Sequence, residues 1–488
     1  RNDCLHKTLI KDNTMLIKKY IPRIAVIFML FHLGMAEDTV LQFLDGKSEK
    51  YAAMSYTIWS WAEVGYQEEK TTELMQAHLR DEGFSINAGV ADIPTAFIAS
   101  YGTGKPVIAI LAEMDALPGL SQSAQPERLP IKEEMPGHAC GHHLFGTGSI
   151  AAAVAVKNWM DVTGASGTVR LYGTPAEEGG SGKVYMVRAG LFNDVDAVLH
   201  WHPSDRNDAS PSSSLANKSA KFRFKGRAAH AAGAPEMGRS ALDAVESMNY
   251  MVNLMREHLP EPARIHYIIT KGGDAPNIVP ENAEVYYYVR HPQVEEMEKI
   301  WDRVIKTAEA AAIGTETSLQ YEVMHGNRPL LPNHPLANVV LEKLTQVGGV
   351  YYSEDETAFA KSIRATLDNP WRELGSEKEI QPFEEKTGRG STDVGGVSWV
   401  VPTAGLRTAT WAPGTPAHSW QAVACGGMSI GHKGMINAAK VLALSAVHLY
   451  QNPALIQDAW KDLNDRRGPN FEYYPLLGDR DPPLDYRK

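Results

Sequence analysis

The sequence predicts an α/β fold in which a mostly parallel sheet is interrupted by a smaller inserted domain. The chain has 488 residues, 43% of them hydrophobic and 22% charged, an ordinary globular composition with enough length for two domains. Strand and helix patterns alternate between residues 95 and 201, as in largely parallel sheets. From Lys218 the order changes to strand, helix, strand, strand, helix, strand, which is the ferredoxin-like order.

In the first part of the chain, residues 39–82 are expected to form two helices, because apolar side chains recur at helical spacing until Gly83. Strands are expected over 95–100 and 107–111, and the second is continuously apolar, as a strand buried on both faces should be. Polar residues follow the strands at their carboxyl ends, where open α/β sheets carry their sites. The other expected elements are a helix over 144–159, a strand over 168–172, a helix over 182–189 and a strand over 197–201.

The inserted domain is expected at residues 216–326, between two parts of the main domain, 37–215 and 327–488. A serine-rich stretch marks the first boundary, and a stretch with glycine and proline marks the second. The tail after Arg466 is expected to wrap the surface. The elements expected from here on are strands over 219–225, 264–270, 284–290 and 317–324, helices over 239–258 and 294–312, a later strand over 405–411 and a helix near 437–450.

The amino-terminal segment has the pattern of a secretory leader. A lysine pair and Arg23 precede the apolar run 24–33, and small residues follow where a signal peptidase cleaves. Met15 is the expected start, which makes residues 1–36 an upstream segment plus a signal peptide. The apolar run is too short to cross a bilayer, and an uncleaved anchor is the alternative. We therefore expect export to the periplasm or beyond, with no stable membrane insertion after cleavage.

The charge balance argues against a polyanionic partner. The formal net charge at pH 7 is −10, and the body of the chain contains no block rich in Lys or Arg. A protein that binds nucleic acid usually carries such a basic block. We therefore expect no nucleic-acid partner.

The strongest local signal is the motif Gly-His-Ala-Cys-Gly-His-His at residues 137–143. Cys140 and His142 stand two residues apart on a glycine-containing turn that opens a helix, so a thiolate and an imidazole can point into one small volume. The alternatives are a buried thiol, a disulfide between Cys140 and Cys425, or a turn with surface histidines. A metal site is favoured because the ends of other expected strands supply further ligand types. These are Glu177, Glu178, His200, His202 and His418.

Two adjacent carboxylates and two alternating histidines suit a hydrolytic metal site. Glu177 and Glu178 face opposite ways in an extended segment, so one can bind a metal while the other reaches a water molecule. A helix start with stabilising negative charge is the alternative. His200 and His202 alternate with Trp201 and face one side of a strand. His202 is the better ligand because it lies further past the strand end, whereas His200 could belong to the core.

Longer motifs extend this pattern over most of the chain. They are AEMDALPG (112–119), GHACGHHLFGTGS (137–149), GTPAEEGGSGK (173–183), LHWHP (199–203), FKGRAAHAAGAPEMGRSALDAVE (224–246), APNIVPENAEVYYYVR (275–290) and GSTDVGGVSW (390–399). Together they resemble the aminoacylase/carboxypeptidase-type dinuclear metallopeptidases, and within them the amidohydrolase branch of aminobenzoyl-glutamate hydrolase and the indole-acetyl-amino-acid hydrolases. The resemblance runs from about residue 48 to 450. It implies a parallel-sheet catalytic domain, an inserted dimerisation domain and two divalent metal ions per subunit.

The resemblance also implies roles for individual residues. Glu177 is expected to act as the general base, and Asp115 to lie behind the metal ligands. Glu113 stands where other branches carry a ligand histidine. His143 and Gly396 depart from the Asp or Asn that relatives carry, which bears on substrate preference more than on reaction class. The implied metal ligands are Cys140, His142, Glu178, His202 and His418.

The resemblance implies that the inserted domain takes part in substrate recognition. His230 matches a family histidine that reaches across a homodimer to the reacting carbonyl, although a surface histidine is the commoner role for such a residue. Asn277 and Arg290 match positions that look like a clamp for the free α-carboxylate of the substrate, and a bidentate guanidinium suits that task. An edge salt bridge is the alternative for Arg290. We thus expect a homodimer formed through the inserted domain.

The sequence therefore predicts a metal-dependent amidohydrolase that cleaves N-acyl or N-aroyl amino acids, similar to aminobenzoyl-glutamate, with a metal-activated water. The expected ions are two zinc or manganese ions per subunit, with cobalt also credible. A dipeptidase or a broad N-acyl-amino-acid deacylase is the alternative within the class. Two alternatives belong to other functional classes. One is a non-catalytic metal-dependent binding protein, and the other is a cysteine hydrolase that uses Cys140 and His142.

Overall fold

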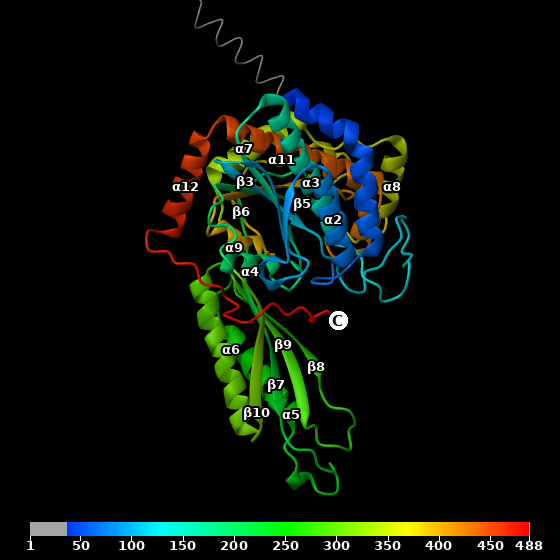
Figure 1. Cartoon of the computed structure of the whole chain (residues 1–488). Helices are drawn as coiled ribbons and strands as arrows, with labels where there is room; N and C mark the ends of the chain where they lie inside the picture. The colour runs from blue at the N-terminus through cyan, green and yellow to red at the C-terminus, as the bar shows by residue number, and fades with distance from the viewer. Residues whose placement is uncertain (1–36, 488) are drawn as a thin grey trace, which may run out of the picture.

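The computed structural model describes residues 37–487, so the expected leader at 1–36 lies outside the described residues. The described chain forms two lobes, drawn in the upper and lower parts of Figure 1. We call the elements from β7 (Ala216–Lys225) to β10 (Ser318–Asn327) the small lobe, and the remaining elements the large lobe.

A six-stranded sheet organises the large lobe. In sheet order its strands are β1 (Ser85–Ala88), β2 (Phe97–Thr103), β4 (Gly167–Thr174), β3 (Val107–Glu113), β5 (Ala197–Ser204) and β12 (Thr403–Ala409). The last four strands in this order are parallel, whereas β1 and β2 pair antiparallel at one edge. Every residue of β3 is buried. The prediction of a mostly parallel α/β sheet is therefore confirmed.

Two long apolar helices pack against each other and on the sheet, namely α3 (His142–Thr163) and α11 (Ser429–Gln451). Their close approach to the strands depends on small residues. A Cβ at Gly434 of α11 would lie 2.4 Å from Ala409 O of β12, so glycine lets the helix touch the strand backbone. The central strands are thus buried, and their carboxyl ends are free to carry polar residues.

The chain enters this lobe through helical residues 37–61 and α2 (Glu69–Asp81), as the apolar spacing predicts. Among residues 37–487, no helix is both long and apolar enough to cross a membrane. The other elements of the large lobe are α4 (Gly182–Arg188), α7 (His334–Val347), α8 (Glu354–Arg364), α9 (Val394–Ser398), α10 (Trp420–Gly426), α12 (Ala454–Arg467) and a parallel pair of short strands, β6 (Ser212–Ser213) and β11 (Lys386–Thr387).

The small lobe contains an antiparallel sheet in the order β10-β7-β9-β8, which is the ferredoxin-like arrangement that the sequence predicts. Side chains alternate between buried and less buried along β9, and the buried face packs on two helices. Phe222, Val285 and Val304 belong to a hydrophobic core of the lobe's own. The domain boundaries remain predictions. The remaining elements of the lobe are α5 (Ala241–Met255), β8 (Arg264–Lys271), β9 (Asn282–His291) and α6 (Val294–Gly314).

The carboxyl-terminal tail corrects one prediction. Residues 469–487 pass between the two lobes instead of following the outer surface (Figure 1). Leu476 packs into the core of the small lobe and Leu477 into that of the large lobe, and each is only 3% exposed. The Arg328 guanidinium lies 4.4 Å from the centroid of the Tyr474 ring and holds the tail at the junction. The tail is buried here because both lobes present apolar side chains to its two leucines.

Candidate metal centre

A cavity of about 740 Å³ opens between the lobes, at the carboxyl ends of the parallel strands. Cavities of this size hold small molecules in many proteins. The large lobe contributes the candidate ligands at the strand ends, and the small lobe contributes the facing wall. That wall includes Tyr288 and Arg290 from β9 and His325 and Asn327 from β10.

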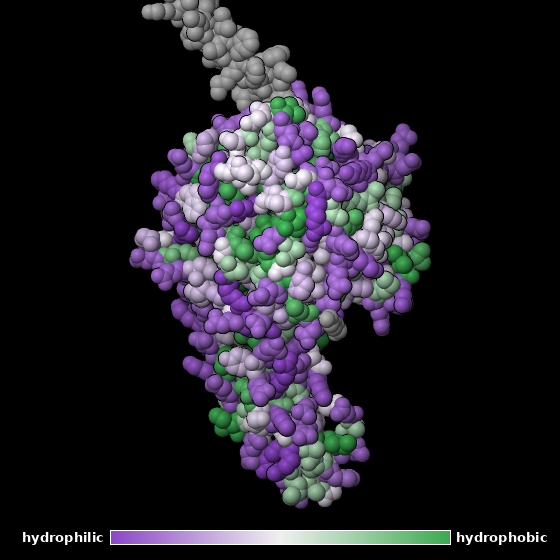
Figure 2. All heavy atoms as spheres, in the orientation of Figure 1, coloured by the Kyte–Doolittle hydropathy of each residue, from purple (hydrophilic) through white to green (hydrophobic). Residues whose placement is uncertain are grey.

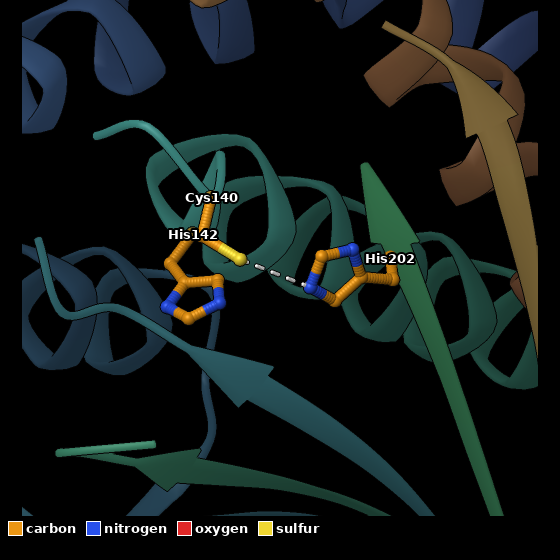
Figure 3. A group of neighbouring side chains, drawn as sticks. All are labelled: Cys140, His142 and His202. Carbon is orange, nitrogen blue, oxygen red and sulfur yellow. Dashed lines mark hydrogen bonds between the residues drawn. The ribbon is translucent and has the colours of Figure 1, made fainter. Parts of the chain in front are cut away.

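The turn at Gly141 brings the first candidate ligands together. Gly141 has a left-handed backbone, with φ +82°, and a Cβ there would lie 2.7 Å from the Pro203 ring. Glycine therefore lets the turn pass closely over β5. Cys140 Sγ lies 3.4 Å from His202 Nε2, as Figure 3 shows. The candidate ligand atoms of Cys140, His142 and His202 all lie within 4.8 Å of one another.

In His142 and His202, a hydrogen bond from Nδ1 orients the imidazole ring. The other ring nitrogen, Nε2, then points into the candidate metal centre. His142 Nδ1 donates to Asp115 Oδ1 at 2.9 Å, and His202 Nδ1 donates to Pro203 O at 2.7 Å. Each Nε2 is then the nitrogen that can bind a metal. Burial lowers the pKa of His202 well below its usual value, so this ring is neutral, as a metal ligand must be. Asp115 lies behind His142, where the family resemblance puts it.

A second group of ligands shares the same thiol. The ligand atoms of Cys140, Glu178 and His418 also lie within 4.8 Å of one another, and Glu178 Oε1 is 3.0 Å from His418 Nε2. Hydrogen bonds to Cys140 and Glu178 raise the pKa of His418 to about 11. The neighbouring Cys140 and Glu178 favour a positive charge on His418. A divalent cation bound at these side chains would compete with the His418 proton. The five predicted ligands thus form two adjacent triads with Cys140 in common.

Glu177 lies in a third group, with Glu113 and one of the imidazoles. The preceding residue, Ala176, has a left-handed backbone with φ +57°, and its N–H donates to the Glu68 carboxylate at 2.9 Å. This turn sends the adjacent carboxylates of Glu177 and Glu178 into different groups, as predicted. Burial and the charges of Glu113 and Glu178 raise the pKa of Glu177 well above its usual value.

A buried ion network beside the first triad has no signal in the sequence. Glu113 Oε1 lies 2.8 Å from Lys183 Nζ, which lies 2.6 Å from Asp393 Oδ1, and these side chains are at most 1% exposed. Lys183 and Asp393 are 210 residues apart, so local spacing could not reveal the contact. Glu113 Oε2 faces His142 Nε2 at 3.1 Å. The structure therefore places Glu113 beside the nitrogen that is available for a metal.

The donor set fits divalent metal ions. Glu113 Oε2, His142 Nε2 and Glu178 Oε1 are buried, and in the described part of the chain their polar contacts are with other members of these groups: Glu113 Oε2 with His142 Nε2 at 3.1 Å, and Glu178 Oε1 with His418 Nε2 at 3.0 Å. Buried polar atoms without well-formed hydrogen bonds are rare in folded proteins, and here they belong to the groups of candidate ligands. A thiolate, imidazoles and carboxylates are ligands that zinc and related ions accept. Both triads are therefore suited to hold a cation.

The residues predicted to bind the substrate do not lie together. Arg290 lines the cavity, whereas His230 and Asn277 are not among its lining residues. Their two loops are joined by a hydrogen bond from Ala231 N–H to Asn277 O at 3.0 Å. His230 is exposed, and its Nδ1 accepts the Gly233 N–H at 3.0 Å, which leaves Nε2–H free to donate outward.

The register of the small-lobe sheet explains this separation. Asn217 and Arg290 are partners at the cavity end of β7 and β9, and Lys225 and Asn282 are partners at the other end. Eight residues of strand separate the two ends, which corresponds to roughly 27 Å. His230 and Asn277 lie in the loops beyond that far end, which we call the tip.

The remaining candidates lie beside the centre. His200 lines the cavity, and its Nε2 has no hydrogen-bond partner in the described residues. His143 lies in the core, where its Nε2 donates to Gly426 O at 3.0 Å, and neither His143 nor Gly396 lines the cavity. Cys140 and the other described cysteine are both free, so the disulfide alternative is excluded.

Replacing Lys183 by Met should lower the stability of the protein, because Glu113 and Asp393 would lose the buried cation that they share. Breaking a buried ion pair from one side costs about 3–5 kcal/mol. Thermal and denaturant unfolding measure the loss. The control is Lys461→Met, which removes the exposed partner of Asp465 and should leave the melting temperature unchanged. A Lys183→Met protein as stable as the wild type would contradict the importance of the network.

Comparisons with known proteins identify relatives over most of the chain. The model of peptidase family M20/M25/M40 matches residues 109–368. A subunit of the p-aminobenzoyl-glutamate hydrolase of Escherichia coli (strain K12) is 42% identical over 448 residues, which cover 86% of this chain and 93% of that protein. The Xaa-Arg dipeptidase of Mus musculus is 30% identical over 434 residues, which cover 86% and 90%.

A solved structure shows the same fold. It is a dinuclear metal-binding peptidase of the M20 family from Bacillus subtilis, with a TM-score of 0.55 and 18% identity, and the match covers 83% of this chain and 99% of that one. The resemblance drawn from the motifs is thereby confirmed. The chain belongs to peptidase family M20/M25/M40 and is an amide-bond hydrolase of that family.

Proposed function

We propose that this hydrolase cleaves the amide bond of N-acyl or N-aroyl amino acids with a metal-activated water. The observation that carries the proposal is the shared thiol. Cys140 belongs to two ligand triads, whereas Glu177 lines the same cavity and belongs to neither. Glu177 is therefore free to exchange a proton with a water molecule. A protein that only binds a ligand has no use for this spare carboxylate, which argues against the binding-protein alternative.

The names of the relatives support an acyl-amino-acid substrate. The Escherichia coli relative is named for p-aminobenzoyl-glutamate, and its similarity covers most of both chains. The mouse relative is named an Xaa-Arg dipeptidase, so a dipeptide is the second candidate substrate. A broad N-acyl-amino-acid deacylase belongs to the same class of reaction.

We propose that the two triads, which share Cys140, would hold two divalent ions. Zinc suits a thiolate ligand best, and manganese and cobalt are the alternatives. Bound there, the ions would polarise the scissile carbonyl and activate the attacking water.

The side chains of the protein supply the proton transfers and the orientation of the substrate. Glu177 takes a proton from the water and then delivers it to the nitrogen of the leaving amine. Arg290 reaches the cavity from the small lobe and binds the α-carboxylate of the substrate with two parallel hydrogen bonds. The substrate is thereby held with its amide bond at the strand ends, near the two triads.

The cysteine-hydrolase alternative pairs Cys140 with His142 as its base, and the contacts of His142 argue against that pairing. Both nitrogens of His142 face carboxylates, since Nδ1 lies 2.9 Å from Asp115 and Nε2 lies 3.1 Å from Glu113. His142 is therefore not oriented to take a proton from Cys140. A thiol nucleophile would also leave the grouping of Glu178 with the thiol unexplained.

Glu177→Gln tests the proposed mechanism, because the amide keeps the size of the side chain and removes its ability to carry a proton. The variant should retain its metal and bind substrate, while kcat falls by roughly two to four orders of magnitude. Glu178→Gln is the matched control and should instead lose metal. Steady-state kinetics with metal analysis of both proteins measures this. If the two phenotypes are exchanged, the two roles are exchanged, and a fully active Glu177→Gln protein would refute the mechanism.

We propose further that the protein works as a homodimer in which the tip of one copy completes the cavity of the other. His230 and Asn277 lie beyond the far end of a strand pair that is roughly 27 Å long, so one chain cannot bring them to its own Arg290. The edge strand β8 exposes Ile268 at 63%, and α5 exposes Tyr250 at 67%. Figure 2 shows such hydrophobic residues on the small lobe. An unpaired edge strand with exposed apolar side chains favours pairing with another protein chain.

Mixing two inactive variants tests this arrangement. His230→Ala and Glu177→Ala proteins should recover partial activity after subunit exchange, because some mixed dimers keep one complete cavity. Native mass spectrometry confirms the exchange, and each variant alone is the control. No recovery despite exchange contradicts the role of the tip. A purified chain that stays monomeric points instead to a different kind of chain as partner, as the name of the Escherichia coli relative suggests.

We also propose export, on the strength of the leader pattern in residues 1–36, which lie outside the described residues. Amino-terminal sequencing of the protein from periplasmic or culture fractions should show a cut near residue 36. Full-length protein that stays inside the cell would overturn this proposal.

A further inference from the structure

We propose that the substrate carries a second carboxylate, which Arg407 binds while Arg290 binds the first. This inference rests on the proposed function and narrows the substrate class to acyl amino acids with two acidic groups. Its support is the charge distribution in the cavity, where two guanidinium groups from different lobes lack a partner among the described residues.

Most basic side chains of the cavity already have partners. Arg206 pairs with Asp205 at 3.1 Å and with Asp208 at 3.4 Å, and Lys386 pairs with Glu384 at 2.9 Å. The tail residue Arg487 donates to the Glu178 carbonyl at 2.8 Å. These contacts fix the cations in place and leave them with less capacity for a ligand.

Arg407 and Arg290 differ from these residues. Within residues 37–487, neither guanidinium group makes a hydrogen bond or an ion pair, although both line the cavity: Arg290 Nε is buried without a partner, and Arg407 is exposed. Arg290 only lies over the Tyr288 ring, 5.4 Å from its centroid. An unpartnered guanidinium inside a cavity is suited to receive a carboxylate, because its planar donors match the two carboxylate oxygens.

The position of Arg407 follows from strand register. On β12 it pairs with His202 of the parallel strand β5, so the two side chains project from the same face of the sheet. Arg407 therefore stands at the border of the first triad. Arg206 already engages Asp205 and Asp208, so neither carboxylate forms an ion pair with Arg407.

The two cations lie on different walls of the cavity. Arg290 comes from β9 of the small lobe, and Arg407 comes from β12 of the large lobe. A substrate with one carboxylate satisfies only one of them. A substrate with two carboxylates satisfies both, whereas a cationic side chain is repelled. The inference therefore also disfavours an Xaa-Arg dipeptide as the substrate of this chain.

Substrate pairs that differ in one charge test the proposal with the metal-loaded full-length enzyme. In the first pair, the second carboxylate lies in the amino acid: N-benzoyl-L-glutamate carries it, and N-benzoyl-L-glutamine carries a neutral amide instead. In the second pair it lies in the acyl group: N-glutaryl-L-alanine carries it, and N-pentanoyl-L-alanine ends in a neutral methyl group. The acidic member of at least one pair should have a kcat/KM about 10–100-fold higher than the neutral member. The pair that shows this preference tells which half of the substrate Arg407 contacts.

Variants then assign the preference to Arg407. Arg407→Gln should lower kcat/KM for the favoured acidic substrate by about 10–100-fold and change that for its neutral partner less than about threefold. Arg407→Lys should retain part of the preference because it keeps the charge. The control is Lys386→Gln at the same cavity, which should retain all of it. Metal content and melting temperature of each variant confirm that it is folded and loaded.

The outcomes separate this inference from the proposed function. Turnover of acidic and neutral substrates at equal rates overturns the inference and leaves the function intact. Equal losses for both substrates in Arg407→Gln also overturn it and assign Arg407 to the metal centre instead. If no substrate is turned over, the proposed function fails. In that case, calorimetry on the metal-loaded Glu177→Gln protein tests the inference by measuring substrate binding. The inference is supported if the acidic substrate binds more tightly than the neutral one and if adding Arg407→Gln removes this difference. Equal binding of the two substrates overturns it.

Discussion

The Asp115 carboxylate joins the two halves of the candidate metal centre. Its Oδ1 accepts the His142 Nδ1–H, and its Oδ2 accepts the Glu178 N–H, each at 2.9 Å. Burial alone would raise the pKa of Asp115, but the hydrogen bond from His142 brings it below the usual value, so the group is charged. One buried carboxylate just past the end of β3 thereby fixes a ligand of each triad relative to the other. The buried end of β3 thus anchors candidate ligands that turns and loops present.

The same centre concentrates acidic side chains in a small volume. Without metal, the charges of neighbouring carboxylates and of the thiol keep protons on the site, as the raised pKa values of Glu177 and His418 indicate. The fully buried cation beside the triads, Lys183, already serves Glu113 and Asp393. Divalent ions bound at the triads would therefore displace these protons and balance the negative charge of the carboxylates. Metal binding and stability are linked in such a site, because the cations bind only the folded arrangement of ligands.

The sequence predicts features that have a local pattern, and it fails where distant segments meet. The alternation of strands and helices places the polar strand ends at one edge. The local motifs supply the candidate ligands, and the family resemblance selects from them the five members of the two triads. The contact of Lys183 with Asp393 joins residues 210 positions apart. Arg407 looks like an ordinary strand residue until register sets it beside His202. The tail, rich in Pro, Asp and Tyr, suggests a surface path, and only the two apolar cores reveal where Leu476 and its neighbour pack.

The long strands of the small lobe keep the residues at their two ends far apart. Because β7 and β9 run without interruption from the cavity to the tip, groups at their two ends cannot meet in one chain. Arg290 at the cavity end lines the cavity of its own chain, and in the proposed dimer the tip residues His230 and Asn277 serve the other copy. The tail limits the freedom of this arrangement, since its leucines enter both cores and Arg487 donates to the Glu178 carbonyl. The tail thus connects the position of the small lobe, and hence of Arg290, to the backbone of a metal-ligand candidate.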